Sequence, residues 1–285
     1  MGSSFLITLR EGLEASLIIS ILLTYLVKTG RRDESGAVWA GTGAAIALCL
    51  AIGTAIFVAV DGLNGDVEYA VEGGIALAAT AVLTHMVFWM RAHARSMGAE
   101  LRAKVERSTT IALAVIAFVA VLREGLETVL FLLSASTETA SGAPVVVGGL
   151  AGLALSVVIG IAVFRGGARL NLRTFFNVTA VLLLLFAAGL AGKTVHELRL
   201  LVGWESGWLV DPVWSIESGP WASGTFYDFM RGLFGWHREP EMMRLLAYVG
   251  YLVPTLALYL RGSRGGAAPA ASPTTASTGT AAARG

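Results

Sequence analysis

Seven stretches of roughly 20 apolar residues divide this chain, and they leave it few ways to fold. They lie at about residues 4–27, 37–60, 69–91, 109–133, 145–165, 174–195 and 244–261. A helix of this length spans the hydrocarbon core of a bilayer with all its backbone groups hydrogen-bonded. Charged residues make up only 14% of the chain, against about 25% in a soluble domain. We therefore predict an all-α polytopic protein of the cell membrane with seven transmembrane helices.

Charges in the connections predict how this bundle is oriented. Basic residues follow the first, third, fifth and seventh stretches, whereas acidic residues dominate the connections between them. Because basic loops stay on the cytoplasmic side, we place the N-terminus outside and the C-terminus in the cytoplasm. Residues 1–262 then form one membrane domain, and the low-complexity segment 263–285 is expected to be a disordered cytoplasmic tail.

The chain also contains an internal repeat. An offset of 113 residues superposes R-E-G-L-E at 10–14 on R-E-G-L-E at 123–127, and an offset of 107 superposes Gly41 on Gly148 and Gly53 on Gly160. Repeat one covers about 1–91 and repeat two about 109–197, followed by an outer loop, 198–243, and the seventh helix at 244–261. Because each repeat has three helices, the second must enter the membrane from the opposite side. Inverted repeats are typical of secondary transporters, whose substrate site lies near the midplane.

The repeated motif places charged residues inside predicted membrane spans, where the free-energy cost of a charge is high. At 100° per residue, Arg10, Glu11 and Glu14 occupy one sector of a helix, and the second motif repeats this geometry. The glycine of each motif allows a close helix approach. The rise of a helix puts Glu14 roughly 15 Å below the outer surface and Glu124 at a similar depth. We expect the two motifs to meet there.

This meeting would gather four carboxylates and two guanidiniums. The candidate metal ligands are Glu11, Glu14, Glu124 and Glu127, with Arg10 and Arg123 balancing part of their charge. Oxygen ligands favour hard or borderline cations such as Fe³⁺, Fe²⁺, Mn²⁺, Mg²⁺ or Ca²⁺. The alternative is purely structural: each arginine neutralises its own glutamate, and the two motifs lock two helices together.

Two further groups of residues are candidates for an ion route. An outer acidic vestibule that concentrates cations would consist of Asp61, Asp66, Glu68, Glu72, His196 and Glu197. An exit path with softer ligands would consist of His85, Met86 and Met90 in the third stretch. The competing interpretations are a solvated rim for the first group and ordinary packing for the second.

Composition excludes several other function classes. The net charge of +1 gives no reason to expect a nucleic-acid partner. A single cysteine, Cys49, leaves no disulfide and no thiolate metal cluster within one chain. No predicted span offers a Ser–His, Cys–His or H-E-x-x-H arrangement, so we expect a transporter and not an enzyme, with no tightly bound cofactor.

The two R-E-G-L-E motifs in the first and fourth of seven spans resemble those of the oxidase-dependent iron permeases. That family includes the fungal high-affinity iron permease and the bacterial EfeU-type ferrous-iron permeases. The stretch from Thr84 to Arg91 and the sequence AGKTVHEL at 191–198 are also similar to EfeU-type sequences. The resemblance covers about residues 1–262.

The resemblance implies that iron is the transported ion and that Glu11, Glu14, Glu124 and Glu127 bind it. It also implies the partners that members of the family work with: an extracytoplasmic iron oxidase or peroxidase and a cupredoxin-like lipoprotein. Some members are linked to lead uptake. The alternatives are a proton-coupled transporter of another divalent metal, such as Mn or Pb, and a non-transporting membrane subunit stabilised by the motif salt bridges.

Overall fold

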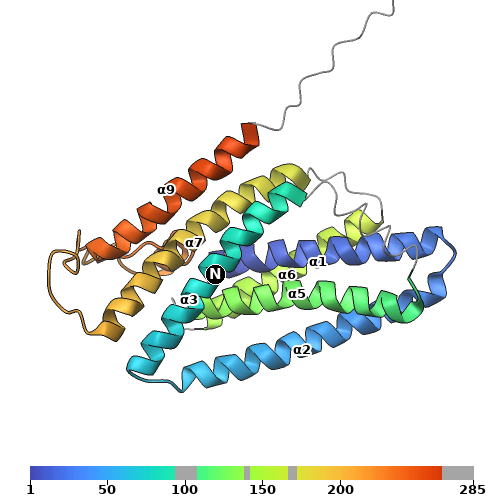
Figure 1. Ribbon diagram of the computed structural model, residues 1–285, viewed down its shortest axis with the longest axis horizontal. Helices are drawn as coiled ribbons and strands as arrows, with labels where there is room; N and C mark the ends of the chain where they lie inside the picture. Colours follow the sequence, from blue (N-terminus) through green and yellow to red (C-terminus); the bar gives the residue numbers. More distant parts are fainter. Residues whose placement is uncertain (94–107, 138–141, 166–171, 265–285) are drawn as a thin grey trace, which may run out of the picture.

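A computed structural model describes residues 1–93, 108–137, 142–165 and 172–264, and Figure 1 shows their arrangement. The elements are α1 (Gly2–Lys28), η1 (Arg32–Glu34), α2 (Ser35–Asp61), α3 (Asp66–His93), α5 (Thr110–Ser136), α6 (Ala143–Phe164), α7 (Leu172–Val202), α8 (Thr225–Phe234) and α9 (Met242–Arg264). Apart from one isolated bridge between Pro212 and Glu241, every regular element in these ranges is helical. The all-α prediction is confirmed for the described residues. The predicted disorder of the tail falls almost entirely outside them.

Local chemistry explains where several of these helices begin and turn. The Thr109 hydroxyl accepts a hydrogen bond from the backbone N–H of Ala112 (3.3 Å) and caps the start of α5. Pro144 lies in the first turn of α6, where its missing N–H costs nothing. The turn between α2 and α3 includes Gly65 at φ +64°, a conformation that favours glycine.

Five of the described helices are long and apolar enough to cross a membrane. They are α2, α3, α6, α7 and α9. The two helices that carry R-E-G-L-E, α1 and α5, are each 27 residues long, but the motif places three charges near the middle of each one. Their length suits a membrane span, and their charges set them apart from the other five.

Each helix of repeat one finds its main partner in repeat two. α1 packs mainly against α6, α2 against α5, and α3 against α7. α1 and α5 are antiparallel, because Ile7 near the start of α1 shares a cluster with Phe131 near the end of α5. At their other ends, Leu22 and Leu26 pack with Leu113. Figure 1 shows α1 and α5 running alongside each other, with α2 on the other side of α5.

Glycines make the same close contact in both repeats. A Cβ on Gly41 of α2 would overlap the backbone carbonyl of Ala114 in α5, and a Cβ on Gly148 of α6 would overlap that of Met1 before α1. Gly41 and Gly148 are related by the 107-residue offset, and Met1 and Ala114 by the 113-residue offset. The helix pairs α2–α5 and α6–α1 therefore touch at equivalent positions.

The glycine of each R-E-G-L-E motif makes a second pair of equivalent contacts. A Cβ on Gly12 would overlap the side chain of Ser156 in α6, and a Cβ on Gly125 would overlap Cys49 in α2. Cys49 and Ser156 are again related by the 107-residue offset. The motif glycines thus allow α6 and α2 to press against the helices that carry the charges.

The segment between α7 and α9 is more ordered than the predicted outer loop, 198–243. α7 continues to Val202, and α8 lies within the segment. Trp236 stacks on Trp214 at a centroid distance of 5.4 Å and meets Trp221 edge-on at 5.2 Å. α8 ends at Gly235, whose φ of +66° brings its backbone against Gly189 of α7. An aromatic cluster therefore folds this segment back onto the helices.

The equivalent glycine contacts predict equal penalties for substitution in the two repeats. Gly41→Leu and Gly148→Leu each force a side chain into a neighbouring backbone, so we expect each to lower stability by about 1–3 kcal/mol. Gly43→Leu is the matched control in α2, since nothing lies within 4 Å of its Cβ position. Thermal unfolding of the three purified variants in detergent measures this. A control as unstable as the other two would contradict the packing described.

Candidate metal site

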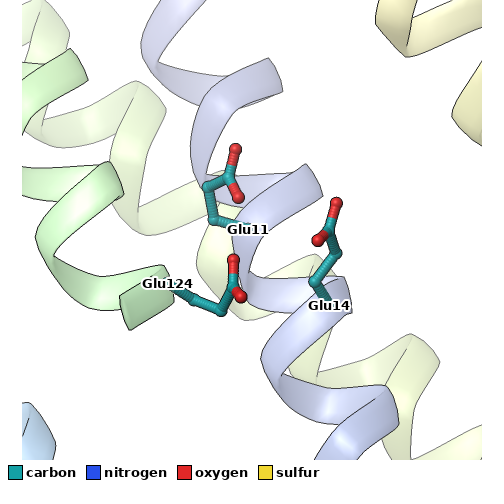
Figure 2. A group of neighbouring side chains, drawn as sticks. All are labelled: Glu11, Glu14 and Glu124. Atoms are coloured by element: carbon teal, nitrogen blue, oxygen red, sulfur yellow. The ribbon is translucent and has the colours of Figure 1, made fainter. Parts of the chain in front are cut away.

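Antiparallel packing of α1 and α5 brings the two R-E-G-L-E motifs together. Each motif lies wholly inside its helix, so its charged side chains leave from one sector. Glu11 and Glu14 from α1 and Glu124 from α5 each place one carboxylate oxygen within 4.8 Å of the others. Figure 2 shows the three side chains converging from the two helices. The structure therefore unites three of the four predicted ligands in one group.

The three carboxylates are almost completely buried. Glu11 is 1% exposed, Glu14 6% and Glu124 5%. Within the two motifs, four buried carboxylate oxygens have no hydrogen-bond partner: Glu11 Oε2, Glu14 Oε1, Glu124 Oε2 and Glu127 Oε2. A buried polar atom without a partner costs about 1–3 kcal/mol, and more when it is charged. Oxygens of this kind are the ligands that Ca²⁺, Mg²⁺, Mn²⁺ and iron ions accept.

Glu127, the fourth predicted ligand, is held differently. Its Oε1 accepts a hydrogen bond from Arg123 Nε at 3.0 Å, and its side chain is 13% exposed. It is a turn beyond Glu124 on α5, next to the group of three. Its Oε2 has no hydrogen-bond partner, so Glu127 can offer that oxygen to the group while Arg123 holds Oε1, and it can offer both oxygens only if Arg123 leaves.

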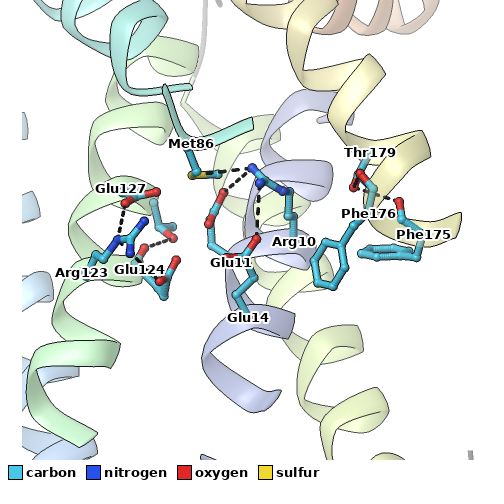
Figure 3. A network of polar contacts seen from close by, with 11 residues as sticks. Arg10, Glu11, Glu14, Met86, Arg123, Glu124, Glu127, Phe175, Phe176 and Thr179 are labelled. Atoms are coloured by element: carbon cyan, nitrogen blue, oxygen red, sulfur yellow. Dashed lines mark hydrogen bonds and ion pairs between the residues drawn. The ribbon is translucent and has the colours of Figure 1, made fainter. Parts of the chain in front are cut away.

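Arg10 is enclosed by partners on the α1 side of the site. Its Nη1 lies 3.4 Å from Glu11 Oε1, and its Nη2 lies 3.4 Å from Glu14 Oε1. The same Nη1 donates to the sulfur of Met86 in α3 at 3.6 Å. The Arg10 side chain is only 2% exposed. Figure 3 shows it pointing toward Met86 and the two glutamates.

Arg123 occupies the equivalent position in repeat two, but its surroundings are more open. Its side chain is 43% exposed, with Glu127 at 3.0 Å and Glu124 at 3.9 Å from Nε. Its guanidinium carbon lies 4.8 Å from the centroid of the Trp89 ring in α3. In the view of Figure 3, Arg123 and Arg10 flank the carboxylates from opposite sides.

The predicted outer vestibule proves to contain a buried lysine. Lys193 of α7 is 2% exposed and donates to Glu72 Oε2 of α3 at 2.7 Å. Its Nζ also lies 3.9 Å from Glu197 Oε1. Gly73 allows this contact, because its Cβ position lies only 3.0 Å from Cβ of Glu197. Two of the predicted vestibule acids therefore share one lysine between α3 and α7.

The other predicted vestibule residues are not gathered with this lysine. His196 Nδ1 lies 3.1 Å from Glu241 Oε1, which also lies 3.0 Å from Arg199. Asp66 is exposed and Glu68 half-buried at the start of α3. The side chain of Asp61 lies outside the described part of the chain. The described vestibule residues therefore do not form one group: Glu72 and Glu197 share Lys193, and His196 pairs with Glu241.

The predicted exit path is divided by the helix geometry of α3. Met86 and Met90 are buried in the core cluster that includes α7, whereas His85 is exposed. Adjacent residues on a helix differ by 100°, so His85 lies on another face than Met86. The structure does not bring these three side chains together.

The iron permease FTR1 family matches residues 1–262 of this chain. The chain belongs to that family. It is 36% identical over 277 residues to the ferrous iron permease EfeU of Yersinia pestis, covering 94% of this chain and 97% of the relative. It is also 36% identical over 273 residues to the ferrous iron permease EfeU of Escherichia coli O6:H1, covering 92% and 96%.

An uncharacterized protein of Archaeoglobus fulgidus is a further relative, 38% identical over 272 residues, with 92% of this chain and 95% of that protein covered. No solved structure matches the chain. Together, the family match and the relatives make this chain a member of a permease family, a class of transporters and not of enzymes. The predicted resemblance is confirmed over almost the whole membrane domain.

The sequence predicted no role for two residues, Lys193 and Trp89. In the structure, Lys193 pairs with two of the vestibule acids and Trp89 contacts Arg123. The ion pair of Lys193 could have been predicted, since it lies four residues before Glu197 in a largely apolar helix. The contact of Trp89 could not have been predicted, because only the packing of α3 on α5 brings its ring to Arg123.

The buried lysine predicts a selective effect on stability. Glu72→Gln leaves the Lys193 ammonium with only the more distant Glu197. We expect a loss of roughly 1–3 kcal/mol, below the usual range for a broken buried pair because Glu72 is 17% exposed. Glu68→Gln, one turn before Glu72 on α3 and half-buried, serves as the control. Denaturation of both variants in the same detergent measures the difference.

The double variant Glu72→Met, Lys193→Met distinguishes the loss of the Glu72–Lys193 ion pair from a loss of packing. Removing both charges at once should restore most of the stability, since neither charge is then left buried alone. A double variant less stable than Glu72→Gln would show that the ion pair is not the cause.

Proposed function

We propose that this protein carries iron ions from outside the cell membrane into the cytoplasm, through a buried site built from its two R-E-G-L-E motifs. The observation that carries the proposal is the group of Glu11, Glu14 and Glu124, whose carboxylates lie within 4.8 Å of one another. Membership of an iron permease family, with relatives named ferrous iron permeases, supports iron as the substrate.

The charge of the site supports a multivalent cation. Four glutamates and two arginines leave two formal negative charges in a setting where each costs several kcal/mol. A divalent ion cancels this excess, and four carboxylate oxygens without donors are ready to bind it. A monovalent ion would leave one charge uncompensated. The site therefore suits Fe²⁺ and chemically similar ions better than Na⁺ or K⁺.

The repeat supports a mechanism of alternating access. We propose seven transmembrane helices, with α1–α3 and α5–α7 as inverted copies and α9 as the seventh. The antiparallel packing of α1 and α5 and the equivalent glycine contacts support this arrangement. Rocking of one repeat against the other would expose the carboxylate group to each side in turn.

The route to the site follows from the orientation predicted by the loop charges. With the N-terminus outside, the acids at the outer ends of α3 and α7 attract cations from solution. An ion that enters loses water ligands and takes carboxylate oxygens of Glu11, Glu14 and Glu124 in their place. An extracytoplasmic iron oxidase or peroxidase with a cupredoxin-like lipoprotein would present the iron, in the manner that the family resemblance implies.

Uptake of radioactive Fe²⁺ into proteoliposomes tests the proposal. Glu14→Gln and Glu124→Gln keep the shape of each side chain but remove one negative charge and one ligand. We expect each to reduce the initial rate at least about 10-fold, the effect of about 1.4 kcal/mol of lost binding. Glu217→Gln in the exposed segment before α8 is the control and should transport at the wild-type rate.

Two results would count against this function. If Glu14→Gln and Glu124→Gln fold normally and take up iron like wild type, the motifs serve only to join the helices. If unlabelled Mn²⁺ competes as strongly as unlabelled Fe²⁺, the protein is a general divalent-metal transporter and not an iron permease.

A further inference from the structure

The two motif arginines are identical in sequence but not in environment. The Arg10 side chain is 2% exposed and has two glutamates and a methionine sulfur around it. The Arg123 side chain is 43% exposed and reaches one glutamate at 3.0 Å. The arginine of the first motif is therefore buried, whereas the arginine of the second motif is accessible from the surface; we call the second one the open arginine.

The open arginine lies at the middle of its helix. Arg123 is near the centre of α5, whose 27 residues match the thickness of a bilayer. A guanidinium facing lipid at that depth costs at least roughly 2.5–3.5 kcal/mol. Arginines at such positions face a bundle interior or a water-filled cavity. We therefore infer that the exposed side of Arg123 faces water and not lipid.

The ring of Trp89 is a second contact for the guanidinium of Arg123, besides Glu127. The guanidinium carbon of Arg123 already lies 4.8 Å from the ring centroid, within the distance of a cation–π interaction. An arginine that leaves Glu127 can therefore stay on the ring without passing into lipid. In the part of the chain that the structure describes, Arg10 makes no cation–π contact, and its side-chain hydrogen bond outside its own motif goes to the sulfur of Met86.

We propose that Arg123 is the gate of the site: the incoming cation displaces it from Glu127 Oε1, Trp89 keeps its contact with the freed guanidinium, and Arg10 stays fixed. This rests on the proposed function and adds the side from which the site is reached. The ion arrives along the wet face between α3 and α5 and takes Glu127 as its further ligand beside Glu124. Arg10 keeps Glu11 and Glu14 in place throughout.

The exposed face of α3 supports this route. His85 is exposed and lies one turn before Trp89, so the two side chains share a side of the helix. Further toward the start of α3, the exposed positions on this side include Ala81, Ala78 and Gly74, whose small side chains leave room along the helix. The open motif arginine therefore stands at the inner end of a face with little side-chain bulk.

Cysteine labelling tests whether this face is wet. In a Cys49→Ala background, Arg123→Cys should react with a charged, water-soluble methanethiosulfonate at least about 10-fold faster than Leu9→Cys. Leu9 is buried and precedes the enclosed arginine of the other motif, so it is the matched control. Anaerobic Fe²⁺ should slow the reaction of Arg123→Cys, because the ion binds beside it.

Two labelling results would overturn the proposal. Labelling of Arg123→Cys by N-ethylmaleimide but not by the charged reagent would show that the face meets lipid. Labelling by neither would show that another protein or a second copy covers it. Either result can occur while wild-type protein still transports iron, so failure here is distinguishable from failure of the proposed function.

Substitution of Trp89 tests its role as a positioning residue. Trp89→Leu removes the aromatic face, so displacement of Arg123 becomes harder and the Kd for Fe²⁺ should rise by about 2- to 30-fold. Trp89→Phe keeps an aromatic face and should restore most of the affinity. Equal Kd values for the two variants would contradict the proposal, since a purely structural role does not distinguish them by aromaticity. Thermal unfolding of both verifies that they are folded.

Discussion

The rest of this structure depends on one constraint: four carboxylates and two guanidiniums must be accommodated in the middle of two largely apolar helices. Each charge alone would oppose insertion, since a charge at the bilayer centre costs at least roughly 2.5–3.5 kcal/mol. The antiparallel packing of α1 and α5 lowers that cost by placing the two arginines among the four glutamates. It does not remove it, because two formal negative charges and several carboxylate oxygens remain without partners. This remaining negative charge is the reason for proposing that a cation binds there.

The same five-residue motif also determines how the helices pack around the site. Gly12 and Gly125 let Ser156 and Cys49 approach the backbones of α1 and α5. A side chain at either glycine would push α6 or α2 away and open the charged group to lipid. The motif thus combines the charges of the proposed metal site with a glycine that allows a neighbouring helix to pack closely against them.

Sequence alone predicted the elements better than their surroundings. The ends of the seven predicted stretches agree with those of the long helices to within about three residues, because hydrophobic length is a local property. The exceptions are α7, which continues to Val202 beyond the predicted 195, and α8, which lies in the segment predicted as a loop. The angle between Arg10, Glu11 and Glu14 followed from the helix repeat, and the duplicate motif gave Glu124 as their partner. The split between exposed His85 and buried Met86 depends on how α3 is rotated, and packing against α7 decides that rotation.

The different surroundings of Arg10 and Arg123 could not be predicted from the sequence, for a physical reason. Arg10 and Arg123 have the same neighbours along the chain, so no local pattern separates them. Only the placement of α3 gives one of them a methionine sulfur and the other an indole ring. The number of membrane spans and the inversion of the repeats likewise concern the bilayer, and they stay predictions supported by helix length and helix direction.

The central claim is that the carboxylates of α1 and α5 together bind the transported ion. Diffraction from crystals soaked anaerobically in Fe²⁺, recorded on both sides of the iron absorption edge, tests it most directly. The account predicts an anomalous peak between Glu11, Glu14 and Glu124 that disappears in Glu14→Gln. A peak found only at the outer helix ends or in the segment between α7 and α9 would contradict it.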